Sequence, residues 1–124
     1  MSAVDGILSN HPLNPFKTWT ILHMKSCDGT GHQGYRKEPI QYMGRSLYFR
    51  GHNTTKGLLN QLDKAHSIFT IATHIVVTGQ SAGGLATFLW SNYIASRAPK
   101  DAKIWALPDS GIFLDYPHYI TKEN

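Results

Sequence analysis

The chain has 124 residues, of which 41% are hydrophobic, and a chain of this size buries most of its apolar surface around one core. Its formal net charge is +4 at pH 7, but the 12 Lys and Arg residues are scattered between Lys17 and Lys122 without a basic stripe, which argues against nucleic-acid binding. No stretch reaches the roughly 20 apolar residues of a membrane span. The amino terminus has neither the basic nor the apolar region of a signal peptide, so the sequence as written predicts a soluble, cytoplasmic protein with no membrane partner.

Cysteine chemistry is limited to Cys27, a single cysteine that cannot form an internal disulfide. Cys27 and His32 are close in sequence but lack the further ligands that a zinc site requires. We therefore expect neither a metal nor a cofactor.

The first half of the chain predicts a strand, a loop, a short strand and a helix. Residues 19–26, "WTILHMKS", are rich in β-branched and aromatic side chains and lead into the glycine-rich loop 27–35, "CDGTGHQGY". Residues 46–51, "SLYFRG", are a second, short strand candidate. Residues 52–66 predict a helix with Asn53 or Thr54 as its N-cap. Its buried face is marked by three leucines at helical spacing: Leu58, Leu59 and Leu62.

The second half continues the alternation of strand and helix. Residues 74–79, "HIVVTG", read as a buried strand, residues 81–98 as a helix stopped by Pro99, and residues 103–108 as a strand that ends at Pro108. Such alternation favours an α/β fold with a mainly parallel sheet and helices on its faces.

The strand–helix junction carries the pattern Gly-Xaa-Ser-Xaa-Gly around Ser81. A residue held at such a corner has a strained backbone, and its neighbours two before and two after, Gly79 and Gly83, must be small. Ser81 would project its hydroxyl from the carboxyl edge of the sheet as a nucleophile, while the backbone N–H of Ala82 would hold an oxyanion. Two other interpretations remain. One is a glycine-rich turn that packs the helix closely on the strand, with Ser81 as the helix cap. The other is a dinucleotide-binding loop, which is disfavoured because Ser81 occupies the position where such a loop needs a glycine to approach the pyrophosphate.

A serine nucleophile needs a base and an acid that orients the base. In the order Ser, acid, His, the histidine that follows Ser81 is His118. The acids between these two residues are Asp101, Asp109 and Asp115. Asp109 is the best placed of these acids, since it follows a strand and would lie at the same edge of the sheet as Ser81. An equal interpretation is that Asp109 is a turn residue whose side chain bonds its own backbone.

The histidines offer no firm base. His118 is placed as an exposed tail residue between Pro117 and Tyr119. His23 and His74 border apolar strand residues and are predicted to be packed rather than catalytic.

Five blocks together resemble the pectin acetylesterase and Notum family of carboxylesterases. They are "GILSN" at Gly6, "CDGTGHQG" at Cys27, "LYFRG" at Leu47, "GQSAGGLATFL" at Gly79 and "PDSGIFLD" at Pro108. The resemblance implies an α/β-hydrolase-like fold and removal of acyl groups from hydroxyls, typically acetyl from pectin, in a secreted or cell-wall setting. Ser81 falls on the family's nucleophile, and an acylated carbohydrate or another ester is the implied substrate.

The resemblance also implies missing parts. The family's Gly-Trp-Cys block, which donates oxyanion-hole N–H groups, and its catalytic Asp and His do not occur at the matching places in residues 1–124. Cys27 matches a family cysteine whose partner would lie outside this chain. We therefore expect a partial α/β-hydrolase domain over residues 1–124.

The missing oxyanion strand would lie between the strands at 19–26 and 74–79. Those two must then pair with each other or with another chain, which predicts low stability or self-association through an unpaired sheet edge.

Two functional classes follow. One is a serine carboxylesterase that is weak or inactive as this isolated chain. The other is a non-catalytic remnant that acts as an interaction or carbohydrate-binding module through the "CDGTGHQG" loop and the basic surface.

Overall fold

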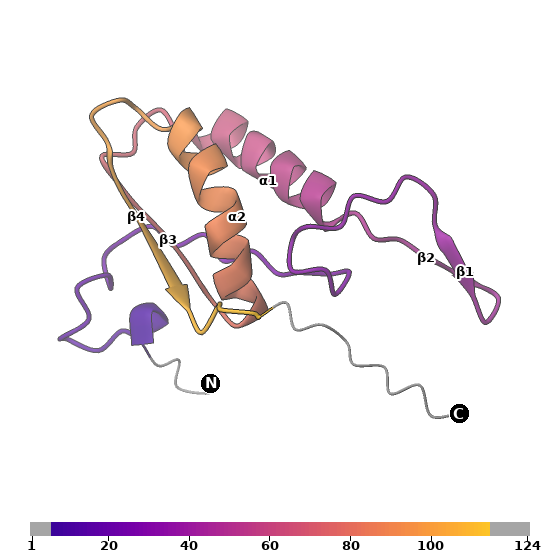
Figure 1. Ribbon diagram of the computed structural model, residues 1–124. Helices are drawn as coiled ribbons and strands as arrows, with labels where there is room; N and C mark the ends of the chain where they lie inside the picture. The colour runs from indigo at the N-terminus through magenta and orange to yellow at the C-terminus, as the bar shows by residue number, and fades with distance from the viewer. Residues whose placement is uncertain (1–5, 115–124) are drawn as a thin grey trace.

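The computed structural model describes residues 6–114. A short 3-10 turn, η1 (Gly6–Leu8), is followed by two short strands, β1 (Ile40–Tyr42) and β2 (Arg45–Leu47), and by the helix α1 (Gly51–His66). The chain then forms the strand β3 (His74–Gln80), the helix α2 (Ala82–Arg97) and the strand β4 (Lys103–Asp109). Figure 1 shows α2 packed along the β3–β4 sheet, with α1 beside α2 and the β1–β2 hairpin projecting from the body.

The β3–α2–β4 unit is the structural centre of the chain. β3 pairs with β4 in parallel, from His74 opposite Lys103 to Gln80 opposite Asp109. A parallel pair needs a crossover connection, which α2 supplies. The predicted α/β class is confirmed, because a small parallel sheet is flanked by two helices.

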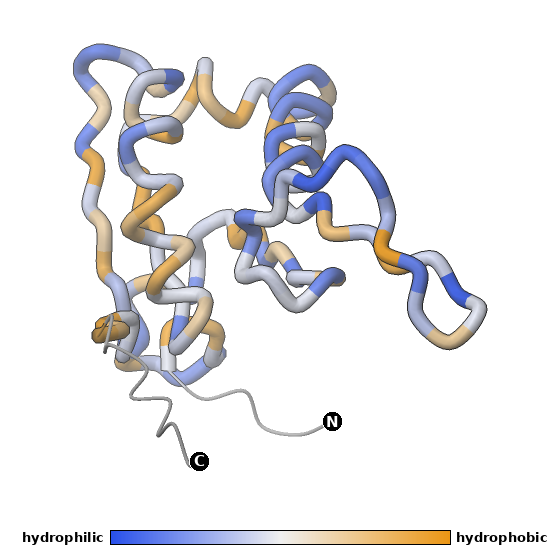
Figure 2. The backbone as a smooth tube through the Cα atoms, turned by 45° about the vertical axis from the view of Figure 1, so that its right-hand side comes forward, coloured by the Kyte–Doolittle hydropathy of each residue, from blue (hydrophilic) through white to orange (hydrophobic). Residues whose placement is uncertain are grey.

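The core is small and lies between the helices and the sheet. Its buried hydrophobic side chains are Leu59, Phe69, Ala86 and Trp90. Of the leucines predicted to face the core, Leu59 is 3% exposed, whereas Leu58 is 39% exposed. Figure 2 shows that α1 is largely hydrophilic and that α2 carries more hydrophobic residues, in keeping with the more central position of α2.

Three local predictions need correction. Residues 19–26 form no strand, because no neighbouring strand pairs with them; Trp19 instead packs edge-on against His74. The predicted short strand is β2, which begins at Arg45 and pairs with β1 across a turn in which Met43 and Gly44 both have positive φ. The helix begins at Gly51, with Arg50 rather than Asn53 or Thr54 in the N-cap position.

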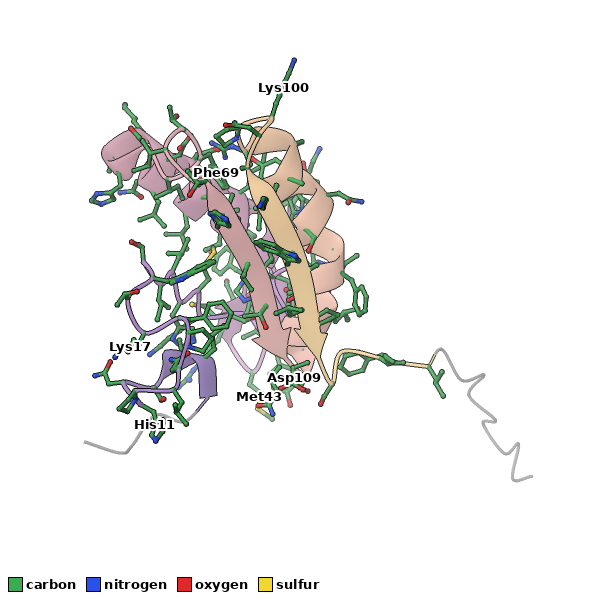
Figure 3. All side chains as sticks on the ribbon, turned by 90° about the vertical axis from the view of Figure 1, so that its left-hand side faces the viewer. His11, Lys17, Met43, Phe69, Lys100 and Asp109 are labelled. Carbon is green, nitrogen blue, oxygen red and sulfur yellow. The ribbon has the colours of Figure 1, made fainter. Side chains whose placement is uncertain are left out.

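The sheet face away from α2 is open within residues 6–114. Ile75 packs on the core, so Val76 and its partner Trp105 project to the opposite side. Trp105 is 45% exposed and Leu107 is 49% exposed. Figure 3 looks onto this side of the sheet, with α2 behind it.

Membrane-spanning character is lacking in the described helices. Neither α1 nor α2 has the length and apolar composition needed to cross a bilayer.

Candidate active site

Ser81 is the one residue between β3 and α2. Its φ is 55° and its ψ is −119°, a backbone conformation that costs a non-glycine residue about 1–3 kcal/mol. The side chain is exposed, and its hydroxyl makes no hydrogen bond to any residue in the range 6–114. Ser81 therefore presents a hydroxyl to solvent from a strained corner at the carboxyl end of β3.

Backbone hydrogen bonds hold this corner from both sides. The Ser81 N–H donates to the Asp109 carbonyl at 2.9 Å, and the Ser81 carbonyl accepts the Leu85 N–H at 3.1 Å. The Ala82 N–H opens the first turn of α2, where N–H groups lack partners within the helix, and this turn contains no acidic residue. A negative oxygen near this N–H would meet the positive end of the helix.

The glycines around Ser81 allow strand and helix to touch. A Cβ placed on Gly79 would lie 2.5 Å from the carbonyl oxygen of Gly83, so no other residue fits at position 79 without movement. A Cβ placed on Gly83 would meet nothing within 4 Å outside the helix backbone. The steric demand therefore falls on Gly79.

A second close contact joins α2 to the segment after β4. A Cβ on Gly84 would lie 2.7 Å from the Asp109 carbonyl oxygen, and a Cβ on Gly111 would lie 2.5 Å from the carbonyl carbon of Gly84. The sequence analysis did not identify this contact, although the extra glycine after Gly83 and the Gly111 that follows "PDS" were the available signals.

Asp109 reaches Ser81 through its backbone. Asp109 is opposite Gln80 in the ladder, so both residues end their strands at one sheet edge, and Figure 3 shows Asp109 at that end of β4. Its exposed carboxylate accepts a hydrogen bond from the Ser110 hydroxyl at 2.9 Å. The Asp109 carboxylate thus bonds a side chain rather than its own backbone, and a role for Asp109 as the acid stays a prediction.

The other predicted acids are not brought to Ser81 in the described residues. Asp101 precedes β4 and is therefore at the opposite end of the sheet, near the Lys100 labelled in Figure 3. Asp115 and His118 lie outside the described residues.

The two described histidines that were considered as bases, His23 and His74, form no hydrogen bond with Ser81. His74 begins β3, at the end remote from Ser81, and stacks on Trp105 with ring centroids 5.9 Å apart. His23 is exposed rather than packed, which corrects the sequence-based expectation.

The carboxylate of Asp28 organises the "CDGTGHQG" loop. Its Oδ1 accepts the Thr30 backbone N–H at 3.0 Å and the Thr30 hydroxyl at 2.7 Å, and its Oδ2 accepts the Gly51 N–H at 2.5 Å. The Thr30 hydroxyl oxygen in turn accepts the Gly34 N–H at 2.8 Å. Burial raises the pKa of Asp28, but hydrogen bonds from Thr30 and from the N–H groups of Gly51 and Arg50 outweigh it, so the pKa lies below its ordinary value.

Hydrogen bonds attach the same loop to both helices. Trp90 Nε1–H donates to the His32 carbonyl at 3.1 Å, and His32 Nδ1 is 2.9 Å from the Thr55 hydroxyl. Gly31, with a φ of 58°, lies next to the start of α2, where a Cβ on Gly31 would be in ordinary contact with the Ala82 carbonyl oxygen at 3.5 Å. The loop thus forms one side of the surroundings of Ala82, a role that the sequence analysis missed; the Asp-Gly-Thr turn pattern was the signal.

Metal-ligating side chains do not cluster in the described part of the chain. Across residues 6–114, no three His, Cys, Asp or Glu side chains are grouped so as to hold an ion.

A parallel strand–helix–strand unit with an exposed, positive-φ serine at its corner defines the class: an α/β protein with a serine at its strand–helix junction. The family model for pectinacetylesterase matches residues 1–124, and the chain belongs to the pectinacetylesterase family. The coarser prediction, an esterase family, is therefore confirmed.

Individual relatives agree with this assignment. The chain is 34% identical over 117 residues to pectin acetylesterase 5 of Arabidopsis thaliana, which covers 93% of this chain and 27% of that protein. It is 31% identical over 112 residues to pectin acetylesterase 4 of the same plant, with 89% and 27% covered. It is 29% identical over 122 residues to the palmitoleoyl-protein carboxylesterase NOTUM of Schmidtea mediterranea, with 94% and 22% covered. The chain thus spans about a quarter of the length of these relatives. No solved structure matches it.

Proposed function

We propose that Ser81 is the nucleophile of a carboxylic ester hydrolase that removes acyl groups from an acylated carbohydrate, such as acetylated pectin. The Ser81 oxygen attacks the ester carbonyl carbon as a base takes the hydroxyl proton, and the Ala82 N–H holds the resulting oxyanion. The alcohol then leaves with a proton, and water releases the acid from the acyl-serine.

The conformation of Ser81 carries this proposal. Its φ of 55° marks a sharp strand–helix corner, where Ser81 exposes its hydroxyl beside the unpaired first turn of α2. A serine that only capped α2 would direct its side chain to the helix, and Ser81 makes no such cap bond.

In this proposal Ser81 is the nucleophile and Ala82 one oxyanion donor, and no histidine of residues 6–114 forms a hydrogen bond with Ser81. Asp109 is the proposed acid because its strand ends opposite Gln80. Removing triad members lowers the rate by orders of magnitude while some oxyanion and binding contribution persists. We therefore expect the isolated chain to be weak or inactive.

A fluorophosphonate probe tests the proposal, because covalent labelling needs an activated serine. We expect slow labelling of the native chain at Ser81, in keeping with a weak isolated chain, its loss in Ser81→Ala and its retention in Ser96→Ala. Ser96 is a matched control, since it is an exposed serine of α2 whose hydroxyl bonds the Tyr93 carbonyl. A peptide map with no label on Ser81, or equal labelling of Ser81 and Ser96, rejects the nucleophile.

A non-catalytic carbohydrate-binding or interaction module is the second candidate. It is favoured by the lack of a hydrogen bond between Ser81 and any described histidine. The "CDGTGHQG" loop is a poor contact surface for it, because Asp28 and Thr30 use their polar groups within the chain.

A further inference from the structure

The first turn of α1 carries the sequence Asn53-Thr54-Thr55. An asparagine followed two residues later by serine or threonine, with any residue except proline between them, is the acceptor pattern for N-linked glycosylation. Within residues 1–124, no other asparagine has a serine or threonine at that spacing. Such a short pattern also arises by chance, so the surroundings of Asn53 decide whether it can carry a glycan.

The side chain of Asn53 is exposed and has no structural role in the described part of the chain. It does not cap α1, which has Arg50 at its N-cap and no side-chain cap bond. Two other asparagines hold the fold together: the Asn14 amide donates to two backbone carbonyls, and the Asn60 oxygen accepts from Arg97. Asparagine is a weak helix former, so Asn53 lowers the intrinsic stability of α1 and makes no bond within residues 6–114 in return.

There is room for a sugar beside Asn53 on the outer surface of α1. Its neighbours on the next turn are Lys56 and Gly57, since residues three and four apart lie side by side on a helix. A Cβ built on Gly57 would meet nothing within 4 Å. The Lys56 ammonium lies over the Tyr93 ring of α2, 5.9 Å from its centre. Figure 2 shows α1 as largely hydrophilic, so a sugar on Asn53 would extend into solvent without displacing a packed side chain.

Thr55, the hydroxyl residue of the pattern, is buried on a different side of α1. It is 4% exposed, and its hydroxyl oxygen is 2.9 Å from His32 Nδ1. Residues two apart on an α-helix are separated by about 200° around its axis, because there are about 3.6 residues per turn. An enzyme that has to bind the Asn53 amide and the Thr55 hydroxyl together therefore cannot reach both once α1 has folded against His32.

We propose that Asn53 is an N-glycosylation site that is modified before α1 folds. The amide nitrogen of Asn53 forms a bond to the anomeric carbon of an oligosaccharide carried on a lipid pyrophosphate. The bond between that carbon and the pyrophosphate oxygen breaks, the lipid pyrophosphate leaves, and the amide nitrogen gives one proton to a base of the transferring enzyme. Thr55 is then free to bond His32. The site goes beyond the proposed esterase reaction, because Asn53 takes no part in that chemistry.

An occupied Asn53 has two consequences for the protein. The lipid-linked donor belongs to the secretory route, so occupancy would overturn the cytoplasmic setting predicted from the amino terminus. A glycan would also keep the outer surface of α1 in water, whereas the open sheet face, which is directed away from α2, would stay free for contacts.

Mass spectrometry of the protein isolated from the cells that make it is the direct test. Trypsin cuts after Arg50 and Lys56 and releases residues 51–56 as one peptide that contains Asn53. Peptide N-glycosidase in H₂¹⁸O converts a glycosylated asparagine to an aspartate that carries ¹⁸O. We expect this label at Asn53, and none when the glycosidase is omitted. Recovery of the peptide with only an unmodified asparagine overturns the proposal.

Matched variants locate the glycan. In a eukaryotic host that secretes the full chain, Asn53→Gln and Thr55→Val should lose the mass that the glycosidase removes, and Thr55→Ser should keep it. Asn60→Gln removes an exposed asparagine of the same helix and should also keep it. Retention of the glycan in Asn53→Gln contradicts the site. Ser81→Ala should be glycosylated like the native chain, so failure of the esterase proposal leaves this result unaffected.

The order of modification and folding has its own test. Oligosaccharyltransferase and its lipid-linked donor are offered the folded, unmodified chain and a synthetic peptide of residues 48–60. We expect the enzyme to glycosylate the peptide much faster than the chain, because Thr55 is buried only in the chain. Equal rates would contradict modification before folding, and a peptide that is never modified would overturn the site itself.

Discussion

The backbone N–H of Ser81 donates to the carbonyl of Asp109 at 2.9 Å, one residue beyond the last pair of the parallel ladder. This bond continues the pairing of β3 with β4 into the corner itself. The strained conformation of Ser81 is therefore held by the end of β4 as well as by α2. The exposure of the Ser81 hydroxyl therefore depends on the end of β4 and on the segment that follows it.

Gly84→Ala should weaken the packing of α2 against the segment that follows β4. The added Cβ would lie 2.7 Å from the Asp109 carbonyl oxygen, and overpacking of this kind lowers the free energy of unfolding by about 1–3 kcal/mol. Gly57→Ala in α1 is the control: it meets no atom within 4 Å, and alanine should raise helix stability by about 0.5–1 kcal/mol. Urea denaturation at one protein concentration measures both. A Gly84→Ala chain as stable as the native chain would contradict the close contact.

Asp28→Asn should change how stability depends on pH. The folded-state pKa of Asp28 lies below its ordinary value, so its contribution is present above the unfolded pKa of about 3.9 and is lost as the pH falls through the folded pKa. At pH 7 the variant should be about 1–2 kcal/mol less stable, because an ionised acceptor of three hydrogen bonds becomes a neutral amide. As the pH falls below 4 and then through the folded pKa of Asp28, the difference in stability between the two chains should shrink.

Thermal melts across pH 3–7 measure this difference for Asp28. Asp101→Asn is the matched control, an exposed aspartate whose melt should follow that of the native chain. A constant gap between Asp28→Asn and the native chain down to the lowest pH would show that Asp28 stabilises without its charge.

The start of α1 shows where sequence reasoning stops. Asn53 and Thr54 have the side chains that usually cap a helix, yet the helix begins at Gly51, because Asp28, distant in sequence, accepts the Gly51 N–H. Local capping patterns cannot show an acceptor that comes from another segment.

The strand predictions also succeed where local sequence decides the structure and fail where a partner distant in sequence is needed. β3, α2 and β4 follow from hydrophobic pattern and breakers alone, because each packs on its sequence neighbours. Residues 19–26 have strand composition, but a strand also needs a partner, and no segment within residues 6–114 pairs with them. The position of Ser81 could be predicted from its glycines, whereas the loop beside Ala82 depends on tertiary contacts of Gly31 and His32.

We predict that the isolated chain self-associates. In residues 6–114, β3 pairs with β4 alone, which leaves one edge of β3 without a ladder partner, and Trp105 and Leu107 are exposed on the open face. Size-exclusion chromatography with light scattering should show a dimer or larger species. Val76→Lys on that face should shift it towards monomer, and Ser96→Lys on α2 should not. A monodisperse native monomer with a sharp melt would argue for a self-sufficient sheet.

Ser81→Ala should abolish any specific esterase rate of the chain. If the native chain hydrolyses p-nitrophenyl acetate, the variant should fall to the rate of an unrelated histidine-bearing protein, because the covalent intermediate forms on the Ser81 oxygen. Ser96→Ala should keep the native rate. Unchanged turnover in Ser81→Ala would reject the nucleophile.

His118→Ala should leave any esterase rate unchanged. His118 lies outside the described residues, and the sequence around it has little apolar content to hold an imidazole against the serine. A base must come within about 2.6–3.2 Å of the serine oxygen, and fixing the backbone of a residue in one conformation costs about 1–2 kcal/mol of entropy. Asp109, the acid that would orient it, has an exposed carboxylate that accepts the Ser110 hydroxyl. His66→Ala is the control, an exposed histidine at the end of α1. A rate at least about tenfold lower in His118→Ala than in His66→Ala would establish a Ser81–Asp109–His118 triad, since loss of a general base typically costs about 10²–10⁴-fold.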